Sequence, residues 1–273
     1  MVRLLHAAVM AGALAAGAGA AETKIVLVAG GPSHGPGTHE HRAGMLLLAK
    51  CLEQTPGIKA IVVENGWPKD GDEAAVFENA KTVAFFMDGG GGQPMLRGAR
   101  LDAMKKLMAD GVGLVCIHYT VDVPKGPLAD LMLEWLGGYY EGGYSRNPTN
   151  TVEVKPVAKD HPITRGLKPV VMTDEFYYKI RFRPGDTRVT NILRMTPPDK
   201  PDEGEQTIAW AIERANGGRS FGFTGGHFHT NWGVPEFRRL VLNALVWTAK
   251  LEVPEGGVQS TVTDEDLQRN VRK

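Results

Sequence analysis

Histidines and small polar residues gather at four places in the sequence, each directly after an apolar run. The last of these places reads Gly225-Gly-His227-Phe-His229-Thr-Asn231-Trp232. An imidazole can act as a general base, a general acid or a metal ligand near neutral pH. Carboxamides and aromatic rings are the groups that orient small ligands in pockets. This stretch therefore predicts either proton transfer or binding of a divalent metal, beside a ligand held by Asn231 and Trp232.

The other three places carry similar chemistry. They are the segment 30–42, with His34, His39 and His41, the run Asp88-Gly-Gly-Gly-Gly92, and the triplet His118-Tyr119-Thr120. Glycines let a backbone approach a ligand and turn its N–H groups inward. We therefore expect Asp88, Gly89, Gly90 and Tyr119 to contact substrate.

A fifth segment, Asp174-Glu175-Phe-Tyr177-Tyr178, combines two acids with two phenols. It can supply a general acid and rings that stack on a sugar. Asp174 and Tyr177 are accordingly predicted to bind substrate, and Glu175 to transfer protons.

The elements that must position these residues alternate along the chain. Continuous apolar runs predict buried strands at 24–29, 58–63, 82–87 and 113–118. Amphipathic patterns predict helices at 39–54, 95–110 and around 128–136. This alternation is typical of βαβ units with a parallel sheet. Ligands bind beyond the carboxyl ends of such strands, so His34, Asp88, His118 and His227 should surround one cleft.

The remainder of the chain divides into a middle and an end. The segment 139–205 is richer in Pro, Gly and charge, with short strands expected at 151–155 and 188–194. Strands at 206–212 and 219–223 and a helix at 235–250 return to the earlier pattern. The residues 253–273 are polar, and we expect them to form a loose tail.

The first 21 residues resemble a secretory signal peptide. Arg3 precedes an apolar run, and a small-residue pattern predicts cleavage near Ala20/Ala21. Export to the periplasm or the medium is therefore expected, and no other stretch is apolar enough to span a membrane. The two cysteines, Cys51 and Cys116, are interpreted as buried free thiols. Lysine plus arginine equals aspartate plus glutamate, at 31 each, which argues against a nucleic-acid partner.

The chain resembles the ThuA-like (trehalose utilisation) family of the class I glutamine-amidotransferase-like superfamily, over a domain at 24–252. The motifs that carry the resemblance are Gly113–His118, His161-Pro162 with Gly166-Leu167, Asp174–Tyr177, Ile208-Ala-Trp210, Gly218-Arg219 and Gly225-Gly-His227. The resemblance implies a flavodoxin-like three-layer α/β sandwich with a mostly parallel central sheet. It also implies a small carbohydrate as the partner.

The superfamily's amidotransferases carry a nucleophilic cysteine at the turn after the fourth strand. Here that turn holds His118, and Cys116 lies inside the strand. Without a thiolate at the turn no acyl-enzyme can form, so glutaminase activity is not expected. The loop after the first strand lacks a G-x-G-x-x-G pattern, and no nucleotide cofactor is expected.

The predicted catalytic residues are His118, His227 and Glu175. A zinc-like divalent metal is a possible cofactor, with His34, His118, His227 and His229 as its ligands; the alternative is metal-free acid–base catalysis by the same histidines. Two functions remain open at this point. One is cleavage, elimination or isomerisation of a disaccharide or 3-keto-glycoside, and the other is a non-catalytic carbohydrate-binding partner protein. The sequence leaves the sugar and the oligomeric state undefined.

Overall fold

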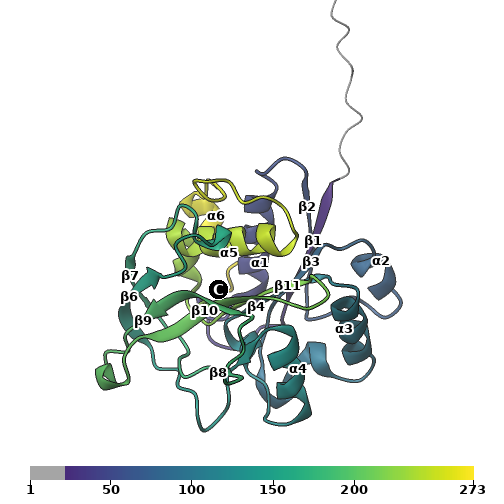
Figure 1. Cartoon of the computed structure of the whole chain (residues 1–273). Coiled ribbons are helices and arrows are strands. Elements are labelled where there is room, and N and C mark those ends of the chain that lie inside the picture. Colours follow the sequence, from purple (N-terminus) through teal and green to yellow (C-terminus); the bar gives the residue numbers. More distant parts are fainter. Residues whose placement is uncertain (1–21) are drawn as a thin grey trace, which may run out of the picture.

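The computed structural model describes residues 22–273; the predicted signal peptide lies outside the described residues. A nine-stranded sheet runs through this part of the chain in the order β2-β1-β3-β4-β11-β10-β9-β6-β7 (Figure 1). The strands are β1 (Thr23–Ala29), β2 (Ile58–Val63), β3 (Thr82–Phe86), β4 (Gly113–Ile117), β6 (Asn150–Pro156), β7 (Val170–Asp174), β9 (Val189–Met195), β10 (Gln206–Glu213) and β11 (Arg219–Phe223). The first five strands in the sheet order pair in parallel, and the other four join antiparallel.

Helices cover both faces of the sheet, which gives the expected three layers. On one face lie α1 (His41–Leu52), α5 (Pro235–Thr248) and α6 (Asp264–Gln268). On the other lie α2 (Glu73–Phe77), α3 (Ala99–Ala109) and α4 (Pro127–Trp135) (Figure 1). Successive strand residues alternate between these faces, so Leu27 packs with the α1/α5 side and Val28 with the α3/α4 side. Because both faces are covered, the central strands are apolar throughout, and this is why the sequence reveals them clearly.

The antiparallel half of the sheet comes mainly from the middle segment. β6 pairs with both β7 and β9, and β9 pairs with β10. A two-stranded sheet of β5 (Gly138–Tyr139) and β8 (Arg181–Phe182) adds to this region. The middle segment thus extends the same sheet rather than forming a second domain.

The carboxyl-terminal segment is ordered, which corrects the expectation of a loose tail. Val253 and Val258 are buried, and Thr263 closes a capping box with Asp266 at the start of α6. The backbone N–H of Asp266 donates to the Thr263 hydroxyl, and the Asp266 carboxylate also pairs with Lys50 of α1. The chain ends over the middle of the molecule rather than beyond its edge (Figure 1).

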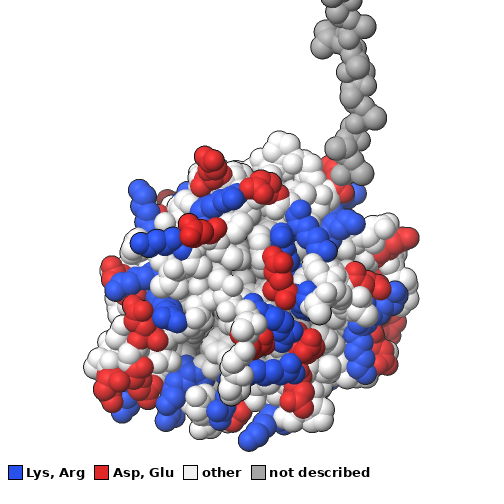
Figure 2. Space-filling model, in the orientation of Figure 1, with Lys and Arg blue, Asp and Glu red and all other residues white. Residues whose placement is uncertain are grey.

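Three further observations concern the helices, the cysteines and the surface charge of the described residues. No helix among residues 22–273 has the length and apolar character needed to cross a membrane. Cys51 and Cys116 are both buried and unpaired with one another, as the sequence indicated. Acidic and basic side chains are interspersed on the face shown in Figure 2, without a large patch of one sign.

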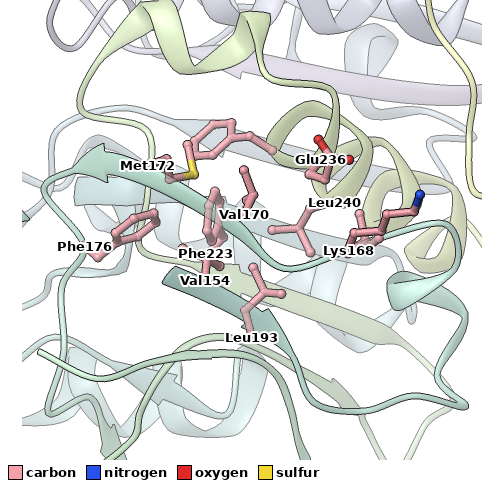
Figure 3. A pocket seen from close by; sticks show the side chains of 11 residues that line it. Val154, Lys168, Val170, Met172, Phe176, Leu193, Phe223, Glu236 and Leu240 are labelled. Atoms are coloured by element: carbon pink, nitrogen blue, oxygen red, sulfur yellow. The ribbon is translucent and has the colours of Figure 1, made fainter. Parts of the chain in front are cut away.

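An apolar crevice lies between the antiparallel strands and α5 (Figure 3). Its walls are Val154, Leu193, Phe223 and Leu240, among others, and its volume is about 20 Å³. That is room for about one water molecule. Its charged lining residues are Lys168 and Glu236, and the others are apolar (Figure 3).

Candidate functional site

Four loops meet beyond the carboxyl ends of β1, β3, β4 and β11. They bring Asp88, His118 and His227 into contact with His39. His118 directly follows β4 and has a φ of 53°, and His39 directly precedes Glu40 and α1 with a φ of 46°. Left-handed backbone is uncommon for residues other than glycine, and at functional sites it persists because the surroundings enforce it. Both turns aim a buried imidazole at the same point.

Hydrogen bonds fix which nitrogen of each imidazole carries its hydrogen. The Nδ1 of His118 lies 2.8 Å from the carbonyl oxygen of Thr224, which can only accept. The Nδ1 of His39 lies 3.1 Å from a carboxylate oxygen of Asp88. Both Nδ1 atoms must therefore donate, and both Nε2 atoms present a lone pair in the neutral ring.

These two lone pairs face each other across a short gap. The Nε2 atoms of His39 and His118 are 3.0 Å apart, and Nδ1 of His227 is 3.1 Å from the Nε2 of His39. Two facing acceptors repel one another unless a positive species lies between them. The donor set is thus suited to a cation.

A carboxylate and a phenol complete the cluster. The Oε2 of Glu175 lies 3.4 Å from Nδ1 of His227 and 3.6 Å from Nε2 of His118. The Tyr177 hydroxyl lies 3.3 Å from the same Nε2 of His118. One ligand atom from each of His39, His118, Glu175 and His227 falls within 4.8 Å of the other three. Three imidazoles and a carboxylate are a donor set typical of zinc and other divalent transition metals.

Buried hydrogen bonds hold the fourth loop in place. The Asp174 carboxylate is fully buried and accepts from the backbone N–H groups of Gly226 and His227, at 2.8 and 3.0 Å. The His39 N–H donates to the His227 carbonyl oxygen at 3.0 Å. The ligand loops therefore position one another through their backbones as well as through their side chains.

Burial and hydrogen bonds shift the pKa values of three residues of the site. It holds the pKa of His118 well below its usual value, and the neighbouring His39 lowers that pKa further. The pKa of Tyr177 is raised well above its usual value, again mainly by burial. For Asp88, burial opposes ionisation, but hydrogen bonds from His39 and Ser33 outweigh it and lower the pKa. Burial thus favours the neutral imidazole of His118, which is the form in which a histidine can bind a metal.

An open cavity of about 440 Å³ lies against this cluster. Its walls include Gly31, Asp88, Gly89 and Tyr119. The cavity adjoins the cluster through Asp88, whose carboxylate bonds His39, and none of the cluster's imidazoles is among its lining residues. His34 is exposed, and its ring lies 3.7 Å from that of His39, centroid to centroid.

Known proteins share sequence features and the fold with this chain. A family described as "Trehalose utilisation" (ThuA) matches residues 26–248. The chain belongs to the ThuA family. No curated protein matches the chain at a significant level.

Two solved ThuA-like proteins share the fold. One, from Bacteroides uniformis ATCC 8492, is 17% identical, with a TM-score of 0.65 over 87% of this chain and 95% of that one. The other, from Parabacteroides merdae ATCC 43184, is 14% identical, with a TM-score of 0.58 over 89% and 94%. The glutaminase domain of the Trypanosoma brucei CTPS, with bound acivicin, gives 10% identity and a TM-score of 0.46 over 92% and 100%.

In this ThuA-family chain, the structure groups one part of the predicted site. His118, His227 and Glu175 lie together, and Asp88 contacts the same cluster through His39. Tyr119 lies on the cavity wall, and its ring centroid is 6.0 Å from that of His39. His34 is exposed, and its ring packs on that of His39.

Other predicted residues lie elsewhere, and the structure corrects their roles. His229 turns away from the cluster, since its Nε2 lies 2.8 Å from the Leu267 carbonyl oxygen of α6. Trp232 is fully buried against Phe86 and Phe237, so its ring cannot stack on a sugar. These two residues follow His227 in a short 3-10 turn, His229–Gly233, that directs them into the core.

The polar residues assigned to substrate also include structural ones. Asp174 is fully buried and holds the 226–227 backbone, and the Asn231 amide donates to the Thr173 carbonyl oxygen at 2.9 Å. The N–H of Gly90 donates to the Asp122 carbonyl oxygen, so it is not free to cradle a ligand. Gly89 is needed for a close backbone approach, because a Cβ atom there would overlap the Tyr119 carbonyl oxygen.

The ring of Tyr177 packs on His118 and Tyr140, with only 3% of the residue exposed. Its hydroxyl, rather than its ring face, reaches the site.

His39 is the site residue that sequence reasoning missed. It lies in a loop with two other histidines, His34 and His41, and nothing in their spacing distinguishes it. His41 bonds the Gly31 carbonyl oxygen instead, at 3.0 Å. The signal that identifies His39 is spatial, namely the left-handed turn that aims its ring at His118.

Proposed function

We propose that this ThuA-family chain is an exported, metal-assisted enzyme that acts on a disaccharide or a 3-keto-glycoside. The observation that carries the proposal is the pair of facing Nε2 lone pairs of His39 and His118, 3.0 Å apart. His227 and Glu175 adjoin this pair. The carbohydrate substrate follows from the family's description, "Trehalose utilisation".

His39, His118 and His227 would hold the divalent cation, with Glu175 as a fourth neighbour. A bound divalent cation supplies Lewis acidity and lowers the pKa of an attached hydroxyl or water. Asp88 orients His39, and the Thr224 carbonyl oxygen orients His118, as outer partners of metal-bound histidines do. These partners favour coordination through Nε2 in both rings.

Glu175 is the residue best placed to move a proton. Its Oε1 accepts from the Asn147 amide at 3.3 Å, while its Oε2 faces the imidazoles. A carboxylate held in this way can take a proton from a sugar hydroxyl, or from the carbon beside a carbonyl, and return it later. Tyr119, on the cavity wall, can contact the sugar, and Asp88 has a partly exposed carboxylate that can bond its hydroxyls.

Glutaminase chemistry is not part of the proposal. The turn after β4 holds His118, and Cys116 is fully buried inside β4. Burial raises the pKa of the Cys116 thiol, which disfavours the thiolate that acyl transfer needs. Export rests on the charged start, apolar run and small-residue cleavage pattern of residues 1–21.

Metal analysis and turnover assays on the same samples test the proposal. Purified chain, loaded with Zn²⁺, Mn²⁺ or Co²⁺, should bind about one ion per chain, and chelation should abolish conversion of 3-keto or ordinary disaccharides. His39→Ala should weaken metal binding by on the order of 100-fold. Glu175→Gln should retain the metal and lose turnover by about 100-fold or more.

His161→Asn is the matched control, because His161 is a half-buried histidine whose ring packs on Trp247 of α5, away from the cluster. It should change neither metal content nor turnover. A chain that takes up none of these ions would contradict the metal centre. A metal-loaded chain that binds a sugar but never converts it would identify a carbohydrate-binding protein instead.

A further inference from the structure

The segment that carries His34 and His39 is held from outside by the other end of the chain. Residues 30–40 contain no helix and no named strand, only turns, bends and an isolated bridge from Thr38 to Phe228. The guanidinium of Arg272 donates to three of their carbonyl oxygens. These are His34 at 2.8 Å, Gly35 at 3.1 Å and Thr38 at 2.7 Å. One side chain thus bonds three carbonyl oxygens of a loop that has no regular secondary structure.

The same guanidinium is paired with a buried carboxylate. The Nε of Arg272 lies 3.1 Å from each oxygen of Glu40, whose side chain is 3% exposed. The Oε1 of Glu40 also accepts from the Gly37 N–H at 2.9 Å. Glu40 therefore fixes both the loop and the arginine that holds the loop.

Arg272 bonds to both sequence neighbours of His39. It donates to the backbone carbonyl oxygen of Thr38 and to the side-chain carboxylate of Glu40. His39 itself has a φ of 46°. A strained backbone of this kind needs surroundings that over-determine it, and the Arg272–Glu40 pair supplies bonds on either side.

The carboxyl-terminal segment has its own anchors, which do not involve the loop. Asp266 in α6 pairs with Lys50, the Leu267 carbonyl oxygen bonds His229, and the Asn270 side chain accepts from Arg42 at 3.2 Å. These contacts bring Arg272 to the site without using His39, His118 or His227. A rigid support outside the first ligands is what metal sites require to keep ligand geometry.

We propose that Arg272 and Glu40 form a clamp that positions His39 in the ligand cluster, so that the last residues of the chain belong to the active site. Neither residue touches substrate in this proposal; both are positioning residues acting through the loop 34–40. The link to metal affinity rests on the proposed function, whereas the link to loop order does not.

Two measurements on Arg272→Ala test the clamp. Amide hydrogen exchange of the peptides covering 34–40 should become at least about tenfold faster, since the His39 N–H bond to His227 would open more often. The affinity for Zn²⁺ or Co²⁺ should fall about 10- to 100-fold, with a changed visible spectrum of the Co²⁺ form. The melting temperature should fall as well, because the buried Glu40 carboxylate loses its charged partner.

Arg269→Ala is the matched control. Arg269 is an exposed arginine three residues earlier, and its side chain bonds only Glu265, one turn back in the same segment. Exchange and metal affinity should stay at wild-type values in this variant. If Arg272→Ala folds poorly, Arg272→Lys keeps the charge but offers one ammonium in place of the planar fork. It should show the same effects in smaller degree.

Unchanged exchange of 34–40 in both Arg272 variants would overturn the clamp. Faster exchange with unchanged metal affinity would also overturn the assignment to His39, leaving only a loop tether. If the wild-type chain binds none of the ions, the metal centre fails, and the exchange measurement still decides whether the clamp exists.

Discussion

At the residue scale, the backbone of one turn explains the placement of His118. Its left-handed φ of 53° turns the side chain out of β4 at the point where the strand ends. The same turn brings the Tyr119 and Asp122 carbonyl oxygens against the loop that follows β3. The residue that meets them there is Gly89, next to Asp88, which orients His39.

Replacing Gly89 should therefore damage both folding and site geometry. A Cβ atom at Gly89 would overlap the Tyr119 carbonyl oxygen and lie 2.6 Å from that of Asp122. We expect Gly89→Ala to lower the free energy of unfolding by about 1 to 3 kcal/mol, because backbone must shift to make room. Urea unfolding followed by circular dichroism measures this.

The same loop supplies the control for this substitution. A Cβ at Gly91 would meet nothing within 4 Å. Gly91→Ala should change the free energy of unfolding by no more than about 0.5 kcal/mol. Equal effects of the two substitutions would show that flexibility of the glycine run, rather than close packing at Gly89, is what the fold requires.

At the element scale, the five-residue helix α6 bonds two other parts of the chain. Its Leu267 carbonyl oxygen holds His229, and its Asp266 holds Lys50 of α1. A helix this short has little stability of its own, so its first-turn hydrogen bonds matter. The Thr263 hydroxyl accepts from the Asp266 N–H at 3.1 Å and so caps the helix.

Removing this cap should loosen α6. Thr263→Ala is expected to lower the free energy of unfolding by about 1 kcal/mol, the usual cost of losing such a cap. Amide exchange in α6 should rise as well. Thr261→Ala is the control, because Thr261 bonds Gln54 only through its backbone. A Thr263 variant as stable as the Thr261 variant would mean that packing alone holds the helix.

Some strands could be predicted from the sequence, whereas short elements such as α6 could not. The strands at 58–63 and 219–223 were predicted with the bounds that the structure has. β7 and α6 were missed. β7 is a five-residue edge strand in which the exposed Val171 interrupts the alternation of polar and apolar residues, and α6 is short and acidic, so neither shows a clear periodic pattern.

Some residues of the candidate site could likewise be predicted from the sequence, and others could not. Residues that directly follow parallel strands, such as His118 and Asp88, could be placed because strand ends share one edge of the sheet. His39 and Arg272 could not be placed. The first depends on one left-handed turn, and the second on the path of a polar segment more than 230 residues later. Contacts of this range have no local signal in one sequence.

At the scale of the whole molecule, the middle segment docks onto α5, which covers one face of the sheet. The 3-10 turn Pro162–Thr164 makes this contact, since the Asn243 amide of α5 donates to the Ile163 carbonyl oxygen at 2.9 Å. His161 precedes the turn and accepts from the Ile163 N–H at 3.2 Å through Nδ1. Its ring packs on Trp247 of α5, with the ring centroids 4.8 Å apart.

This docking makes global stability depend on pH in a definite direction. Burial lowers the pKa of His161 from 6.5 to about 4 in the folded chain. The unfolded chain therefore binds more protons than the folded chain between these values, and stability falls as the pH falls. The contribution of His161 is complete above about pH 6.5 and is lost progressively down to about pH 4.

His161→Asn isolates this contribution, since asparagine can accept from the Ile163 N–H but does not titrate. Between pH 7 and pH 5 the wild-type chain should lose about 1 kcal/mol more of its free energy of unfolding than the variant, after allowance for solvent screening of a partly exposed ring. Urea unfolding of both chains at the two pH values gives the difference directly, and the other histidines cancel because both chains share them. Parallel losses in the two chains would mean that His161 is as easily protonated in the folded chain as in the unfolded one, and that the turn docks onto α5 without burying the imidazole.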